Sequence, residues 1–163
     1  MTGLPKLDRI DIRILSTLQT RGDITNVALA ETVGLSSSPC LQRVKRLEKA
    51  GYIEGYRAVI NPAKLAEAVV VFTEVTLADH RPRDFQKFEA AIRVHENVQE
   101  CHLLSGGYDY LIKFMARSVA QYQEIMEELL DRNLGIDKYF SYVAIKPIVS
   151  RNVVPVENLL GRT

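Results

Sequence analysis

The 163-residue chain has little of several features that mark particular classes of protein. Its two cysteines, Cys40 and Cys101, cannot form a disulfide framework. The residues near Met1 do not combine a basic start with an apolar stretch, so no secretory signal is predicted. The longest apolar run, residues 68–72, is far short of the ~20 residues that cross a bilayer. These absences predict a soluble protein of the reducing cytoplasm, with no membrane partner.

Side-chain patterns of catalysis and metal binding are also scarce. The histidines His80, His95 and His102 are isolated, and the one near pair, Cys101 and His102, would point to opposite faces of a strand. Cys40 falls on the apolar side of its predicted helix, where a buried, unreactive thiol is expected. No Walker loop, dinucleotide glycine fingerprint or serine elbow is present. The sequence therefore predicts no metal site, no cofactor and no enzyme.

The chain has almost no excess of either sign of charge, because 21 Lys and Arg balance 20 Asp and Glu. The balance is uneven along the chain. Residues 1–60 contain nine basic and six acidic residues, a net of +3, and the remainder has 12 basic and 14 acidic, a net of −2. A small basic module joined to a mildly acidic one is a weak indication of nucleic-acid binding in the first part.

Two helices are expected before the first glycine turn. Apolar residues recur at three- and four-residue spacing from Leu7 to Leu18, with Asp8 and Asp11 near the positive end of that helix. Thr25 can cap a second, short helix, and Gly34 permits the left-handed turn that ends it.

A third helix is announced by three serines, Ser36, Ser37 and Ser38, and then a proline. At about 100° per residue, Cys40, Val44 and Leu47 form its apolar sector. The opposite face collects Ser38, Gln42, Lys45, Arg46 and Lys49, with Arg43 between the two faces. Two helices joined by a glycine turn, the second with polar and cationic groups outward, predict a helix-turn-helix that enters a major groove. The alternative is that these cations only solvate a surface helix.

Two β-prone runs, residues 52–55 and 56–60, could pair as a wing beside the third helix, with Arg57 as a phosphate contact. Asn61 and Pro62 then indicate a hinge. We therefore predict a winged helix-turn-helix over residues 1–60 and a hinge over 61–67. The candidate DNA contacts are Ser36, Ser37, Ser38, Gln42, Arg43, Lys45, Arg46, Lys49 and Arg57.

The second half alternates strands and helices in the order βαββαβ. The predicted strands are residues 69–77, 98–105, 108–115 and 139–145, with helices opening near Pro82 and at Ser118. Ser118 and Gln121 form the pattern of a capping box. A twice-repeated split βαβ unit predicts a ferredoxin-like sandwich over residues 68–163, so the fold class is α+β. Because two helices cover one face of such a sheet, the bare face predicts a dimer by sheet packing.

A glycine turn between the second and third of these strands could bind a zwitterion. The backbone N–H groups of Gly106 and Gly107 can approach a carboxylate, and Asp109 could accept from an ammonium group. The alternative is an ordinary hairpin turn with its tyrosines in the core and Asp109 in solvent.

The segment 36–53, SSSPCLQRVKRLEKAGYI, resembles the recognition-helix signature of the Lrp/AsnC transcription factors. Residues 7–11 and 24–27 resemble the same family, and the second half extends the match to nearly the whole chain. The resemblance implies a winged helix-turn-helix and a RAM-type domain for effector binding and self-association. It also implies homodimers that assemble into octamers, a small amino acid as effector, and double-stranded DNA as partner. The expected setting is bacterial or archaeal and nucleoid-associated.

In the family, a glycine-x-x-aspartate element between these strands contributes to the amino-acid site, and it matches Gly106 and Asp109 here. Gly107 departs from the polar or acidic residue common at that position. The resemblance adds neighbouring candidates on the same turn and on the fourth strand. The candidate effector residues are Leu104, Gly106, Tyr108, Asp109, Tyr110, Ser141 and Tyr142.

Three functions are compatible with these patterns. The first is a sequence-specific regulator modulated by an amino acid, with a roughly palindromic operator because dimers read paired half-sites. The second is a ligand-independent architectural octamer that compacts DNA. The third is a metabolic enzyme built on the ferredoxin-like half, for which the nucleophile and acid–base pair are missing from the sequence.

Overall fold

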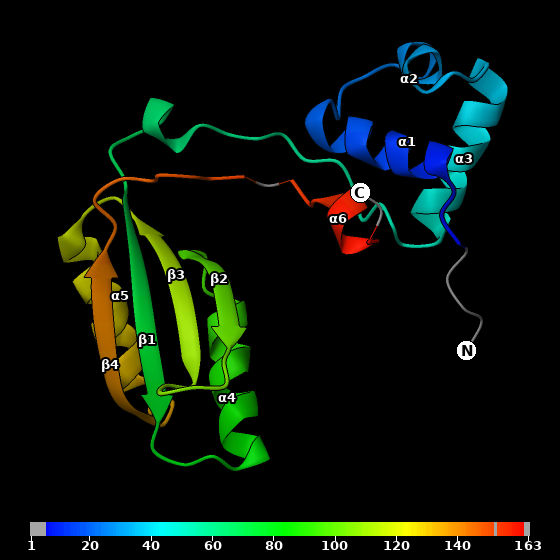
Figure 1. Cartoon of the computed structure of the whole chain (residues 1–163). Helices are drawn as coiled ribbons and strands as arrows, with labels where there is room; N and C mark the ends of the chain where they lie inside the picture. The colour runs from blue at the N-terminus through cyan, green and yellow to red at the C-terminus, as the bar shows by residue number, and fades with distance from the viewer. Residues whose placement is uncertain (1–5, 152, 162–163) are drawn as a thin grey trace. The chain divides into compact units, whose positions relative to one another are not determined.

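A computed structural model of the chain describes residues 6–151 and 153–161, which divide into two compact units (Figure 1). Among the described residues, one unit combines 6–59 with 150–151 and 153–161, and the other is Ile60–Val149. This division differs from the predicted one, in which residues 68–163 form a single domain. The reason is that the chain returns to the first unit after completing the sheet of the second.

Three helices build the first unit: α1 (Arg9–Thr20), α2 (Asn26–Val33) and α3 (Ser37–Lys49). They surround one apolar core that includes Ile14, Leu29 and the α3 residues Cys40, Val44 and Leu47. The predicted apolar sector of α3 is therefore confirmed. On α1 the buried stripe is wider than predicted and includes Ile12 and Leu15, because other elements pack on more than one side of this helix.

The helix boundaries follow from local chemistry. Asp8 caps α1 and forms a reciprocal capping box with Asp11. The Thr25 hydroxyl accepts from the N–H of Ala28 at 3.2 Å, and Gly34 adopts φ 76°, ψ 40° in the turn between α2 and α3. Ser36 occupies the cap position of α3 without a side-chain hydrogen bond to the helix.

The predicted wing is wrong as a pair of strands, because residues 53–60 form no regular secondary structure. Tyr52 and Ile53 pack on the helical core, whereas Val59 and Ile60 are largely exposed. An isolated two-stranded ribbon is marginal in water without a partner face, and the hydroxyl of Tyr56 instead binds Glu48 on α3 at 3.0 Å. The predicted hinge contains a short 3-10 helix, η1 (Pro62–Lys64).

The C-terminal segment packs on α1 through a short helix, α6 (Val156–Leu159), which the sequence reasoning did not anticipate. The Gln19 side chain bonds both backbone groups of Val154, accepting from its N–H at 2.7 Å and donating to its carbonyl at 3.0 Å. Val156 adds to the apolar core of the helical unit.

The second unit is a four-stranded antiparallel sheet with the order β2-β3-β1-β4. The strands are β1 (Val69–Leu77), β2 (Val98–Leu103), β3 (Tyr110–Ala116) and β4 (Ile136–Val143). Helices α4 (Pro82–Arg93) and α5 (Val119–Asp131) cover the same face of the sheet (Figure 1). The predicted ferredoxin-like βαββαβ order is therefore confirmed, although β4 begins three residues earlier than predicted and β2 ends two earlier.

Alternation along the strands separates a covered face from an open one. Val71, Thr73 and Val75 of β1 are buried under the helices, whereas Phe72 lies on the other face and is 36% exposed. The capping box predicted at Ser118 is half formed: Ser118 accepts from the N–H of Gln121, but the Gln121 side chain accepts from the N–H of Arg117 instead. No helix among the described residues is long and apolar enough to cross a membrane.

Candidate functional sites

The outward face of α3 is the candidate DNA-binding surface. Ser38, Gln42, Lys45 and Lys49 are all exposed, and at 100° per residue they fall within roughly 60° of one another, opposite the buried sector. Ser37 is exposed at the first turn of the same helix. Hydroxyl, amide and ammonium groups at this spacing match the donors and acceptors on base edges and phosphates in a major groove.

Two of the predicted DNA contacts, Arg43 and Arg46, are turned toward α1. The Arg43 guanidinium lies 2.6 Å from Asp8 and 2.9 Å from Asp11, and that of Arg46 lies 2.5 Å from Asp11. The hydrogen bonds from Asp11 N–H and Arg43 lower the pKa of Asp8 to about 2. Ser36 and Arg57 are exposed, and neither lies on the outward face of α3.

These carboxylate partners were missed by sequence reasoning, although a signal for them exists. Asp8 and Asp11 are three residues apart, and so are Arg43 and Arg46. Residues three apart lie on one face of a helix, so two such pairs on adjacent helices can meet as a group.

At the end of the sheet, Asp109 forms the centre of the candidate effector site. Its carboxylate accepts from the backbone N–H of Leu77 at 2.7 Å, and both of its oxygens lie 3.0 Å from Nε2 of His80. The Asp109 side chain remains 18% exposed. An ionised carboxylate offers about four lone-pair sites, so the two donors present leave capacity for an ammonium group. His80, in the β1–α4 loop, is a neighbour that sequence reasoning did not identify.

The glycine turn beside Asp109 is open. Gly106 and Gly107 are exposed, and a Cβ built on either would meet no described atom within 4 Å. Leu104 is also exposed, and its N–H donates to the carbonyl of Asp109 at 2.8 Å. Lack of space for a side chain therefore does not explain, within a single chain, why glycine occupies these two positions.

Tyr108 and Tyr142 belong to the same region. Tyr142, on the open face of β4, has its hydroxyl 3.4 Å from Glu74. Desolvation, Glu74 and the nearby Tyr108 phenol together raise the pKa of Tyr142. The structure thus leaves Leu104, Gly106, Tyr108, Asp109 and Tyr142 at accessible surface of this unit.

Two other candidates turn toward the helix-covered face of the sheet: Tyr110 is buried in the core, whereas Ser141 lies on the edge strand β4 and stays exposed. Tyr110 is 1% exposed and packs against Phe88 with ring centroids 4.6 Å apart, and its hydroxyl donates to Glu89 at 2.9 Å. The Ser141 hydroxyl lies 2.5 Å from that of Tyr122 on α5. Because successive strand residues face opposite sides, Ser141 and Tyr142 cannot line one surface of the sheet together.

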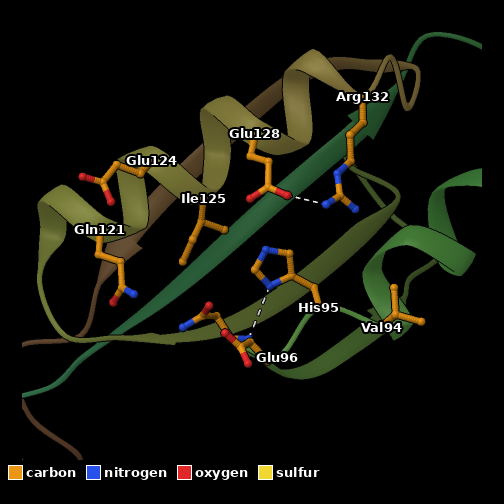
Figure 2. A pocket seen from close by; sticks show the side chains of 9 residues that line it. Val94, His95, Glu96, Gln121, Glu124, Ile125, Glu128 and Arg132 are labelled. Carbon is orange, nitrogen blue, oxygen red and sulfur yellow. Dashed lines mark hydrogen bonds and ion pairs between the residues drawn. The ribbon is translucent and has the colours of Figure 1, made fainter.

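A concavity of this unit lies elsewhere. A groove of about 390 Å³ separates α5 from the 94–97 turn, and Figure 2 shows His95, Glu128 and Arg132 turned toward it. His95 Nδ1 accepts from the N–H of Asn97, and Arg132 pairs with Glu128. None of the predicted effector residues lines this groove. A second hollow of about 360 Å³, between α4 and β2, has Tyr110 in its wall.

A three-helix unit with an outward polar and cationic helix, joined to a ferredoxin-like unit, defines a helix-turn-helix DNA-binding protein with a separate sensory domain. Comparison with known families agrees. Residues 7–54 match the winged helix-turn-helix DNA-binding family, and residues 70–154 match the Lrp/AsnC ligand binding domain. The chain belongs to the Lrp/AsnC family of DNA-binding transcription regulators. The match to a ligand-binding domain favours modulation by an effector over a purely architectural role.

Similar proteins include the leucine-responsive regulatory proteins of Haemophilus influenzae and Escherichia coli K12. They are 45% and 43% identical to this chain over 146 residues, which is 90% of this chain and 88% and 89% of theirs. Among solved structures, a Neisseria meningitidis transcriptional regulator in complex with L-Met has a TM-score of 0.89 and 32% identity, and covers 94% of this chain and 99% of its own. An AsnC family regulator from Agrobacterium tumefaciens has the same TM-score and coverage at 27% identity.

Proposed function

We propose that this regulator binds operator DNA through the outward face of α3 and senses a small amino acid at the turn formed by residues 104–109. The observation that carries the DNA half is the cluster of exposed polar and cationic side chains on one sector of that helix. Lys45 and Lys49 supply charge for phosphates or guanine, and Ser38 and Gln42 supply hydrogen-bonding groups. We assign phosphate contacts to Ser36, Ser37 and Arg57, which are all exposed.

The effector half is supported by the partly exposed carboxylate of Asp109 beside open glycines. An amino acid carries an ammonium and a carboxylate a few ångströms apart. Asp109 can accept from the ammonium, and backbone N–H groups of the glycine turn can donate to the carboxylate. Tyr108, Tyr142 and Leu104 flank this turn and would contact the ligand side chain. The solved complex of the meningococcal regulator with L-Met supports a free amino acid as the class of ligand.

Self-association is the third part of the proposal. The open face of the sheet presents Phe72, Phe140 and Tyr142, which are 36%, 57% and 52% exposed, and large exposed apolar patches mark interaction surfaces. Sheet packing between two copies would bury them and form a dimer, and dimers would assemble into an octamer. We also place the protein in the cytoplasm at the nucleoid, acting by binding and not by catalysis.

A gel-shift titration tests the first two parts. The DNA upstream of the chain's own gene is titrated at fixed salt with and without each common amino acid. We expect specific binding to a roughly palindromic site and a shift in apparent affinity with one amino acid. Specific binding that ignores all amino acids would contradict the role of Asp109, and binding with no preference over random DNA would contradict the regulator.

A matched pair of variants sharpens the effector test. Asp109→Asn removes the charge beside the glycine turn, whereas Asp79→Asn makes the same change at an exposed residue of the adjoining loop. We expect the first to abolish the amino-acid response and the second to preserve it, with DNA affinity in the absence of effector unchanged in both. For self-association, Phe140→Asp should shift the sedimentation coefficient toward that of the monomer.

A further inference from the structure

The four cationic side chains of α3 fall into two groups that face different ways. Lys45 and Lys49 are exposed on the outward sector, and within the described residues neither has an ion-pair partner. Arg43 and Arg46 lie on the flank that meets α1, where both contact carboxylates. Simple counting of basic residues on the helix therefore overstates the charge available to DNA.

Asp11 is the centre of the second group. Its side chain is 0% exposed, although it is a carboxylate in the first turn of α1. Oδ1 accepts from Arg43 at 2.9 Å, and Oδ2 accepts from Arg46 at 2.5 Å and from the N–H of Asp8 at 3.0 Å. A buried carboxylate is tolerated only when it is paired and hydrogen-bonded. Both oxygens of Asp11 meet that condition, and two of the three donors come from the recognition helix.

Asp8 completes the group from the exposed side. Its carboxylate accepts from the N–H groups of Ile10 and Asp11, both at 2.9 Å, and from Arg43 at 2.6 Å. Two carboxylates thus face two guanidiniums, and the net charge of the four side chains is zero. Drawing Arg46 away to a phosphate would leave the buried Asp11 with one fewer counter-charge, which opposes such a movement.

We propose that Asp11 is a positioning residue for DNA recognition: together with Asp8 it neutralises Arg43 and Arg46 and holds α3 in register against α1. DNA contact is thereby left to Lys45, Lys49 and the polar side chains between them. Arg43 and Arg46 act as links between the two helices and not as readers of the operator. This assignment rests on DNA binding by α3, and it identifies which basic residues of that helix carry the binding.

The test is the salt dependence of DNA affinity, because each protein–phosphate ion pair that forms releases counterions. Each phosphate neutralised on B-DNA contributes about −0.9 to the slope of log Kobs against log salt. The full-length protein is titrated with a mixed-sequence 30-base-pair duplex over a range of KCl concentrations. Arg46→Met and Lys49→Met are the matched pair, since each removes one cation from α3 and keeps an unbranched stem.

We expect Lys49→Met to reduce the magnitude of the slope by about one per bound protomer and Arg46→Met to leave it at the wild-type value. A loss of slope in Arg46→Met equal to that in Lys49→Met would show that Arg46 neutralises a phosphate, and would overturn the proposal. Absence of wild-type binding would overturn both the proposal and DNA binding by this helix, so the two failures are distinguishable.

Variants of the two carboxylates should change the salt slope in the opposite direction to Lys49→Met. Loss of structure alone would not produce that change. Asp11→Asn frees positive charge beside the DNA, so we expect a steeper slope and tighter binding to the mixed duplex. Asp8→Asn is the second variant, because asparagine caps a helix about as well as aspartate and circular dichroism should show an intact fold. Unchanged slopes in the folded acidic-side variants would contradict the neutralising role.

Discussion

A chain of hydroxyl groups inside the sheet unit allows a sharp prediction about stability. Thr73 on β1, Tyr122 on α5 and Ser141 on β4 are linked by hydrogen bonds, with 2.7 Å from Thr73 Oγ1 to the Tyr122 hydroxyl and 2.5 Å from there to Ser141 Oγ. Thr73 is 0% exposed. Tyr122→Phe would remove the central hydroxyl and keep the ring, whose edge-on contact with Phe114 has a centroid distance of 5.5 Å.

The expected cost follows from what the lost hydroxyl leaves behind. A buried polar group without its partner destabilises a protein by about 1–3 kcal/mol, and Thr73 becomes such a group. In a unit of this size, each kcal/mol corresponds to a fall in Tm of about 4–8 °C. The matched control is Tyr110→Phe, because the Tyr110 hydroxyl binds Glu89, which is only half-buried and which water can reach.

The assay is urea denaturation at one protein concentration. It includes the single variants Thr73→Val and Tyr122→Phe and their double variant. We expect Tyr122→Phe to cost more than Tyr110→Phe. The double variant should cost less than the sum of its singles, because it leaves no stranded hydroxyl on either residue. Strict additivity, or a Tyr122→Phe variant as stable as the wild type, would refute the reasoning.

Three further predictions concern the helical unit. Gly34 has φ 76°, so Gly34→Ala should destabilise the protein by about 1–2 kcal/mol. Gly106→Ala is the control, because the space around its Cβ position is open, and it should leave the free energy of unfolding unchanged. Equal effects of the two variants would contradict the turn geometry. The pKa of Asp8 is lowered from 3.8 to about 2, so its contribution to stability is present above pH 3.8 and is lost as the pH falls through 2. The difference in unfolding free energy between wild type and Asp8→Asn should accordingly shrink over that range, and a constant difference would argue against the ion pair. Gln19→Ala removes both bonds to Val154 and should lower the Tm and expose the C-terminal segment to protease, with the exposed Gln86→Ala as control.

Much of the fold could be predicted because its signals are local. The apolar positions of α3, the cap at Thr25 and the left-handed Gly34 each depend on neighbours within a few residues. The βαββαβ order followed from periodicity in the same way. The predicted wing failed for the complementary reason: β-prone runs pair stably only where a partner surface covers them, and Val59 and Ile60 at the end of the second run are largely exposed.

The candidate sites were predicted less completely than the fold. Asp109 and the glycine turn became candidates because a short motif carries them, and the outward face of α3 because a helical wheel defines it. The family resemblance grouped Tyr110 and Ser141 with them, but the pleat of the sheet turns both toward the helices. His80 was missed because nothing local links it to a residue 29 positions away.

The sequence by itself determined the helices and strands, their order and the polar sector of the recognition helix, since these depend on spacing and on residues close along the chain. Only the tertiary structure decided where the long cationic side chains point. Arg43 and Lys45 are two residues apart on one helix, yet one meets a carboxylate of α1 and the other meets solvent. Which partner a flexible, charged side chain finds depends on the packing of α1 against α3. The return of residues 153–161 to the helical unit likewise depends on contacts between distant parts of the chain.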